Sequence, residues 1–141
     1  MSSNKNTTLE TFNHWLDYWD NHNIEGIMEL LHDEVIFENW DGTIIKGKKT
    51  LRKAWTIWFS QNDNFKFTKK EIFIDEHNQK LLFRWQLNWQ SHEKHFENRE
   101  ESRNGVDIIH YKQNKIILKS SFIKTKILIE NKAYFLIPDN K

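Results

Sequence analysis

The stretch NGVDIIHYKQNKIILKSSFI, residues 104–123, decides the fold of this chain. β-Branched and aromatic residues lie on both sides of the pair Gln113-Asn114, a pattern typical of two strands joined by a tight turn. The stretch therefore predicts the last long hairpin of a small curved sheet. It also places one carboxylate, that of Asp107, among apolar residues, where an ionised group is costly.

The segment before this hairpin alternates most clearly between apolar and polar residues. Within residues 79–90, one face carries Leu81, Phe83, Trp85, Leu87 and Trp89, and the other carries Leu82, Arg84, Gln86, Asn88 and Gln90. This period of two predicts a half-buried strand of an antiparallel sheet. Similar patterns predict strands at 35–40, 43–46, 65–75 and 116–127. A further long strand is predicted after a charged hairpin at 91–95 and runs to residue 111.

Three stretches instead carry apolar residues at helical spacing, namely residues 9–19, 24–31 and 48–61. Three helices on the concave face of a strongly bent sheet form a cone. The order of elements therefore predicts an α+β, cystatin-like roll with a mixed or antiparallel sheet. Bending such a sheet usually requires bulges, and Asn104-Gly105 is the predicted position of one.

Length and composition narrow the possible functions. The 141 residues predict a single domain, with a frayed N-terminus at 1–6 and a C-terminal extension at 128–141 that forms an edge strand or a docked segment. Lysines and arginines number 21 and acidic residues 20, so neither nucleic acid nor a membrane is expected as a partner. The chain has no cysteine and no histidine pair at metal-ligand spacing, so no metal is expected.

The sequence also bears on localisation. The segment MSSNKNTTLE, residues 1–10, lacks the apolar run of a signal peptide. No apolar stretch of 18 residues occurs anywhere in the chain. A soluble cytoplasmic protein is therefore expected.

Three segments resemble the nuclear-transport-factor-two-like superfamily, which includes SnoaL-like polyketide cyclases and ketosteroid isomerase. They are NHNIEGIMELLHDEVIFENWDG (21–42), KGKKTLRKAWTIWF (46–59) and GVDIIHYKQNKII (105–117). The resemblance covers roughly residues 8–126. It implies a SnoaL-like domain with a cavity between the first helix, the first strand and the sheet.

The resemblance also implies roles for single residues. In ketosteroid isomerase, an aspartate base works with an oxyanion hole of a tyrosine and a protonated aspartate. Asp107 falls at the protonated aspartate, Asn39 at the base and Trp15 at the tyrosine. An amide cannot accept the substrate proton, and an indole offers one N–H donor but no acidic phenol. Two of the three roles are therefore altered, and the steroid-isomerase mechanism itself is not expected.

Asp107 is the candidate catalytic residue. It shares a strand face with Ile109 and Tyr111, whereas His110 points to the other face. In a cavity, desolvation would favour the neutral carboxyl group and suit Asp107 to general-acid or proton-donor chemistry. The alternative is a carboxylate satisfied by backbone amides at a bulge. Farther up the same face, Glu101 and its two charged neighbours Arg99 and Arg103 form either a polar pocket mouth or, as we expect, solvated charges.

The expected ligand-binding residues are Trp15, Tyr18, Trp19, Asn39, Trp40, Ile109 and Tyr111. Their aromatic character favours a small, flat, apolar molecule. One interpretation is a cofactor-free enzyme for isomerisation, cyclisation or dehydration. A second is a non-catalytic module that binds a ligand or a partner chain, and a third is a structural dimer whose cavity is filled by its own tryptophans. A homodimer is expected, with Arg84, Gln86 and Asn88 on the contact face.

Overall fold

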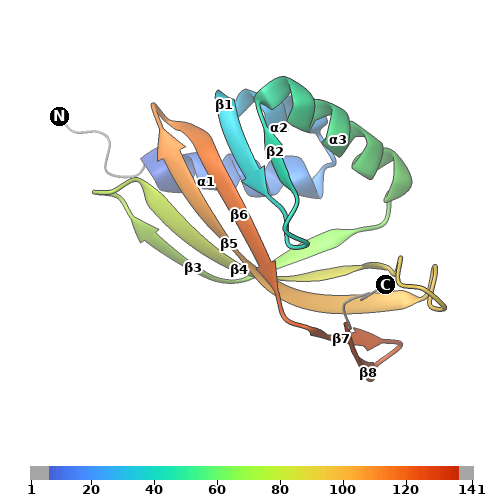
Figure 1. Ribbon diagram of the computed structural model, residues 1–141. Coiled ribbons are helices and arrows are strands. Elements are labelled where there is room, and N and C mark those ends of the chain that lie inside the picture. The colour runs from blue at the N-terminus through green and yellow to red at the C-terminus, as the bar shows by residue number, and fades with distance from the viewer. Residues whose placement is uncertain (1–6, 137–141) are drawn as a thin grey trace.

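The computed structural model describes residues 7–136, in which three helices lie on one side of a strongly curved sheet (Figure 1). The elements are α1 (Thr7–Asp20), α2 (Ile24–Glu29), β1 (Leu31–Glu38), β2 (Ile44–Lys46), α3 (Lys48–Gln61), β3 (Lys66–Asp75), β4 (Lys80–Gln90), β5 (Glu100–Lys112), β6 (Lys115–Ile123), β7 (Lys126–Ile129) and β8 (Lys132–Phe135). No helix within the described range is both long and apolar enough to cross a membrane.

The sheet is mixed, and its strands follow the order β2-β1-β6-β5-β4-β3. The pair β1 and β6 is parallel, whereas the other neighbours along this path are antiparallel. The predicted α+β roll, with three helices on the concave face of a curved sheet, is therefore confirmed.

The core fills the space between the helices and the concave face. On β4 the predicted alternation holds, because Phe83, Trp85 and Leu87 are buried while Arg84 and Asn88 are exposed. The helices contribute the buried residues Phe12, Trp15, Ile27, Met28, Leu51 and Trp55. The contacts between these aromatic and aliphatic side chains hold the helices on the sheet.

The predicted bulge at Asn104-Gly105 is wrong, because β5 pairs with β4 without interruption from Lys80↔His110 to Gln90↔Glu100. Register shifts occur instead in β1, in β3 and, between β5 and β6, at His110/Tyr111. Gly105 has a different role. A Cβ atom there would lie 2.5 Å from the Phe122 carbonyl oxygen and 2.5 Å from the indole ring of Trp85. The glycine lets a large ring lie flat against the strand.

The predicted last strand, 116–127, is divided in the structure. β6 ends at Ile123, and β7 then pairs with β5 at Glu101 and Ser102. β7 and β8 form a hairpin at the end of the molecule away from the helices (Figure 1). The two alternatives for the C-terminal extension are an edge strand and a docked segment. Residues 128–135 form the edge strand. The expectations for residues 1–6 and 137–141 lie outside the described residues.

Candidate functional site

A cavity of about 240 Å³ lies between the concave face of the sheet, α3 and the β1–β2 hairpin. Its walls are mainly aromatic and consist of Trp19, Phe37, Asn39, Trp40, Ile45, Ala54, Trp55, Trp58, Phe67, Trp85, Asp107, Lys119 and Ser121. A small void of about 30 Å³ adjoins it, shares Asp107 and Lys119, and is also lined by Trp15. The site is therefore an apolar chamber with a few charged groups on one wall.

A larger groove, of about 530 Å³, runs over the ends of β3, β4, β5 and β7. Its lining is mostly polar, with residues such as Asn88, Gln90 and Glu130. The smaller aromatic cavity is the better candidate site, because ligand sites are usually apolar with a few placed polar groups.

Asp107 lies on the cavity wall and is 4% exposed, on the inward face of β5 as its phase predicted. Ser121 lies directly opposite on β6, and its hydroxyl donates a hydrogen bond of 2.7 Å to one Asp107 oxygen. The other oxygen lies 3.2 Å from the Lys119 ammonium, which also donates to the Ser121 hydroxyl at 2.9 Å. The three side chains form a closed triangle. The carboxylate is satisfied by these side chains, rather than by backbone amides at a bulge.

Lys119 is a cavity-lining residue that the sequence analysis missed. Its side chain is 11% exposed, and its ammonium lies 4.7 Å from the ring centre of Phe37 and 5.9 Å from that of Trp55. Such cation–π contacts and the facing carboxylate stabilise a buried ammonium. The cavity therefore contains a complete ion pair among aromatic rings.

A one-residue bulge explains why Lys119 could not be anticipated. Counting back from the turn at residues 113–114 would place Ser120 opposite Asp107 and turn Lys119 outward. The register shifts by one residue after His110, so that Asp107 pairs with Ser121 and Ile109 with Lys119. Because side chains alternate along a strand, this single shift turns Lys119 inward.

The β1–β2 hairpin contributes the next two predicted residues, Asn39 and Trp40, which both line the cavity. The Asn39 side-chain oxygen accepts a 2.8 Å hydrogen bond from the Trp40 backbone, so the amide is partly occupied by its own turn. Trp19 of α1 also lines the cavity, as expected. Three further tryptophans form cavity walls as well, namely Trp55, Trp58 and Trp85.

Tyr18, Ile109 and Tyr111 do not line the cavity, contrary to expectation. Tyr18 lies on the side of α1 that meets α2, where its ring covers Gly26. Ile109 is fully buried in the core. Tyr111 lies beyond the bulge, and its hydroxyl is buried without a hydrogen-bond partner among the described residues. Burial, together with the nearby charge of Glu76, raises the pKa of Tyr111.

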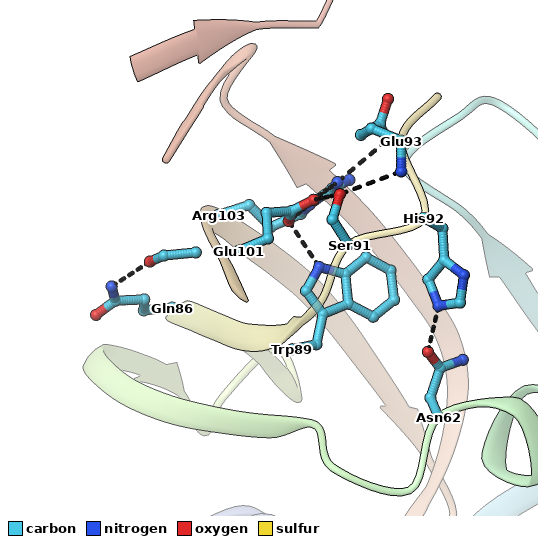
Figure 2. Close-up of polar contacts among 9 residues, drawn as sticks. Asn62, Gln86, Trp89, Ser91, His92, Glu93, Glu101 and Arg103 are labelled. Carbon is cyan, nitrogen blue, oxygen red and sulfur yellow. Dashed lines mark hydrogen bonds and ion pairs between the residues drawn. The ribbon is translucent and has the colours of Figure 1, made fainter. Parts of the chain in front are cut away.

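A second polar cluster is buried where solvated charges were expected (Figure 2). Glu101 and Arg103 are 3% and 2% exposed, and two hydrogen bonds of 2.5 and 2.6 Å join them. Trp89 and Ser91 also donate to Glu101, at 2.6 and 2.9 Å. Burial alone would raise the pKa of Glu101, but the hydrogen bonds and charge of Arg103 outweigh it and lower that pKa. The expectation of solvated side chains is wrong for both residues.

This cluster reaches the cavity through Trp40. The Arg103 guanidinium lies 5.3 Å from the ring centre of Trp40 and 5.1 Å from that of Trp89. Arg103 therefore contacts one wall of the cavity, although it does not line the cavity itself. For the part of the chain that the structure describes, no group of three or more acidic, histidine or cysteine side chains is arranged to hold a metal ion.

The family model for the SnoaL-like domain matches residues 12–118, more than half of the chain. This protein therefore belongs to the SnoaL-like domain family. A search of curated proteins gave no match.

Solved structures are similar in fold. An NTF2-like protein of unknown function from Mesorhizobium loti has a TM-score of 0.69 and 18% identity, over 88% of this chain and 96% of that one. A Mycobacterium tuberculosis protein in complex with estradiol-17beta-hemisuccinate has a TM-score of 0.69 and 18% identity, over 82% and 92%. TerC, co-crystallised with polyporic acid, has a TM-score of 0.70 and 12% identity, over 84% and 92%. At these identities the similarity establishes the fold alone.

Proposed function

We propose that this protein binds a small, planar, apolar molecule in the aromatic cavity and that Asp107 carries out cofactor-free proton transfer on it. The observation that carries the proposal is the buried carboxylate of Asp107 on the wall of that cavity. An ionisable group kept in an apolar chamber is costly, and such groups concentrate at functional sites.

The walls support the proposed ligand class. Rings of Trp19, Trp55 and Trp85 offer flat surfaces, against which a conjugated molecule gains both burial and stacking. Two proteins of similar fold were crystallised with ring-containing small molecules, estradiol-17beta-hemisuccinate and polyporic acid.

The proposed chemistry is a proton shift next to a carbonyl group, a step that isomerisation, cyclisation and dehydration share. Asp107 is the group to move this proton, because the Asn39 amide at the position of the steroid-isomerase base cannot accept one. One Asp107 oxygen lies 3.2 Å from the Lys119 ammonium on the wall of the cavity. We therefore propose Asp107 as the base of this step.

Calorimetry with flat bicyclic ketones, such as 2-tetralone, tests the binding half of this proposal. We expect saturable binding with accompanying quenching of tryptophan fluorescence. NMR-detected exchange of the α-protons of the ketone in D₂O tests the chemical half, with Asp107→Asn as the inactive comparison. Absence of binding across the ketone panel would refute the proposal.

A second candidate function is non-catalytic binding of the same ligand class. Asn39 favours this non-catalytic alternative, because it stands at the position of the family's base and offers no proton acceptor. Its side-chain oxygen already accepts a hydrogen bond from the Trp40 backbone. Wild-type protein that binds the ketones tightly but exchanges no protons would support this alternative.

We also propose that the protein forms a cytoplasmic homodimer through the outer face of the sheet. Apolar side chains gather on this face, and Phe73 and Phe122 are 61% and 51% exposed. On β4, Leu82 pairs with Phe73, and Arg84 pairs with Val106, the partner of Phe122, so the contact would combine apolar and polar groups. Exposed apolar patches of this kind are typical of contact surfaces.

A further inference from the structure

The cavity contains a charged group that the proposed proton transfer does not yet use, the ammonium of Lys119. Two of its three N–H donors are accounted for by Asp107 and Ser121, at 3.2 and 2.9 Å. The residue lines both the main cavity and the smaller void. One N–H donor of the ammonium, which is paired with the Asp107 carboxylate, therefore remains for a ligand.

Other donors on the walls are less suited to this task. The indole nitrogens of Trp19 and Trp85 are enclosed and have no hydrogen-bond partner in the described part of the chain. The Asn39 side-chain NH₂ is a donor without charge, and within residues 7–136 only its oxygen is engaged, by the Trp40 backbone N–H. Lys119 thus combines charge, position and a free donor beside the carboxylate of Asp107.

From this geometry we infer that Lys119 is the electrophilic partner of Asp107 and takes a ligand that carries a ketone oxygen. The inference rests on the proposed function of the same cavity. The Lys119 ammonium binds the carbonyl oxygen, and the Asp107 carboxylate takes a proton from the neighbouring carbon. The C–H bond breaks, an O–H bond forms on Asp107, and the electron pair becomes an enolate whose oxyanion lies against the ammonium. Asp107 then returns the proton to the same or to a conjugated carbon.

The arrangement suits this step for a physical reason. A positive charge fixed in an apolar chamber stabilises a developing oxyanion more strongly than the same charge in water does. The aromatic faces of Phe37 and Trp55 help to fix it. Ser121 bonds to both partners and holds the carboxylate and the ammonium in a set orientation.

The first test measures exchange of the α-protons of 2-tetralone in D₂O by NMR. We expect Lys119→Met to slow exchange by about 100-fold, the size of effect that loss of one oxyanion donor produces. Binding of the ketone, measured by calorimetry, should change far less. Lys112→Met, which removes an exposed lysine from the adjacent strand, is the matched control and should exchange at the wild-type rate.

A second measurement avoids the unpaired carboxylate that Lys119→Met leaves behind. The probe is 4-nitrophenol, whose absorbance distinguishes phenol from phenolate, with Asp107→Asn as the starting protein. We expect Asp107→Asn to bind the phenolate more tightly than wild type does, because a competing negative charge is gone. The double variant Asp107→Asn/Lys119→Met should then lose this phenolate binding at least about tenfold. A merely structural role for Lys119 would not produce these opposite effects.

The outcomes separate the two proposals. If Asp107→Asn abolishes exchange while Lys119→Met retains it, the role of Lys119 is refuted and the proposed function stands. Equal phenolate binding by Asp107→Asn and by the double variant would also refute that role. If the wild type exchanges no protons, both the catalytic half of the proposed function and the role of Lys119 are overturned.

Discussion

Glu101 and Arg103 stand two residues apart on β5 and point the same way, so that their charges meet inside the protein with an N–O distance of 2.5 Å. Both side chains are almost fully enclosed. Glu93, from the loop between β4 and β5, adds a contact to Arg103 at 3.2 Å. The pair therefore ties a surface loop and the Trp40 wall of the cavity to the central strand.

Removing one member of this pair should be costly. We expect Arg103→Met to lower the free energy of unfolding by about 3–5 kcal/mol, because it leaves the Glu101 charge buried and unpaired. Arg52→Met is the control, since the Arg52–Glu25 pair lies in solvent away from the proposed contact face and should contribute little to the free energy of unfolding. Urea denaturation of both variants measures the difference, and equal losses would contradict a special role for the buried pair.

The same pair predicts a pH dependence of stability. The pKa of Glu101 is lowered in the folded protein, so the unfolded chain binds a proton more readily. The stabilisation is therefore complete above the unfolded value of about 4.3 and is lost as pH falls below it. Unfolding free energies between pH 6 and pH 3 should fall more steeply for the wild type than for Glu101→Gln. Parallel pH profiles would argue against an ionised Glu101 in the fold.

Filling the cavity should separate ligand binding from folding. Ala54 lines the cavity on α3, and Ala54→Phe would occupy much of the space. We expect this variant to fold and to lose ketone binding at least about tenfold, because the stacking surface is no longer free. Ile57→Phe, at an exposed position on the same helix, is the matched control and should bind as the wild type does. Normal binding by Ala54→Phe would place the ligand elsewhere.

Tyr111→Phe should stabilise the protein by about 1 kcal/mol, since it removes a buried hydroxyl that has no partner among the described residues. Thermal unfolding measures this gain. Tyr134→Phe, at the one half-buried position of the otherwise exposed strand β8, should have little effect. Ketone binding by Tyr111→Phe should equal that of the wild type. Reduced binding would indicate that Tyr111 contacts the ligand.

Light scattering after size exclusion tests the proposed dimer. We expect a dimer for the wild type and a monomer for the double variant Phe73→Lys/Phe122→Lys, because two charges would be buried in an apolar contact. Ile57→Lys introduces a charge at an equally exposed apolar position on α3 and should stay dimeric. A monomeric wild type would remove the basis for this proposal.

The sequence predicted those features that depend on local pattern. Alternation along 79–90 assigned the faces of β4 correctly, and the same reasoning turned Asp107 inward. Lys119 was missed because an extra residue on β6, between Ile116 and Leu118, changes the phase of that strand, and no sequence pattern marks it. Glu101 and Arg103 were misjudged because each charge alone favours solvent, and only their mutual contact makes burial acceptable.

The parallel pairing of β1 with β6 bears on how the molecule folds. Phe37 lies beside Lys119 in this pair, so two walls of the cavity come from opposite ends of the chain. Contacts between residues so distant in sequence form late and slowly, because a long loop must close first. During synthesis, the earlier strands and helices would assemble before β6 emerges. The pocket would then take shape only after β6 has emerged, and a ligand that binds it would stabilise the completed fold.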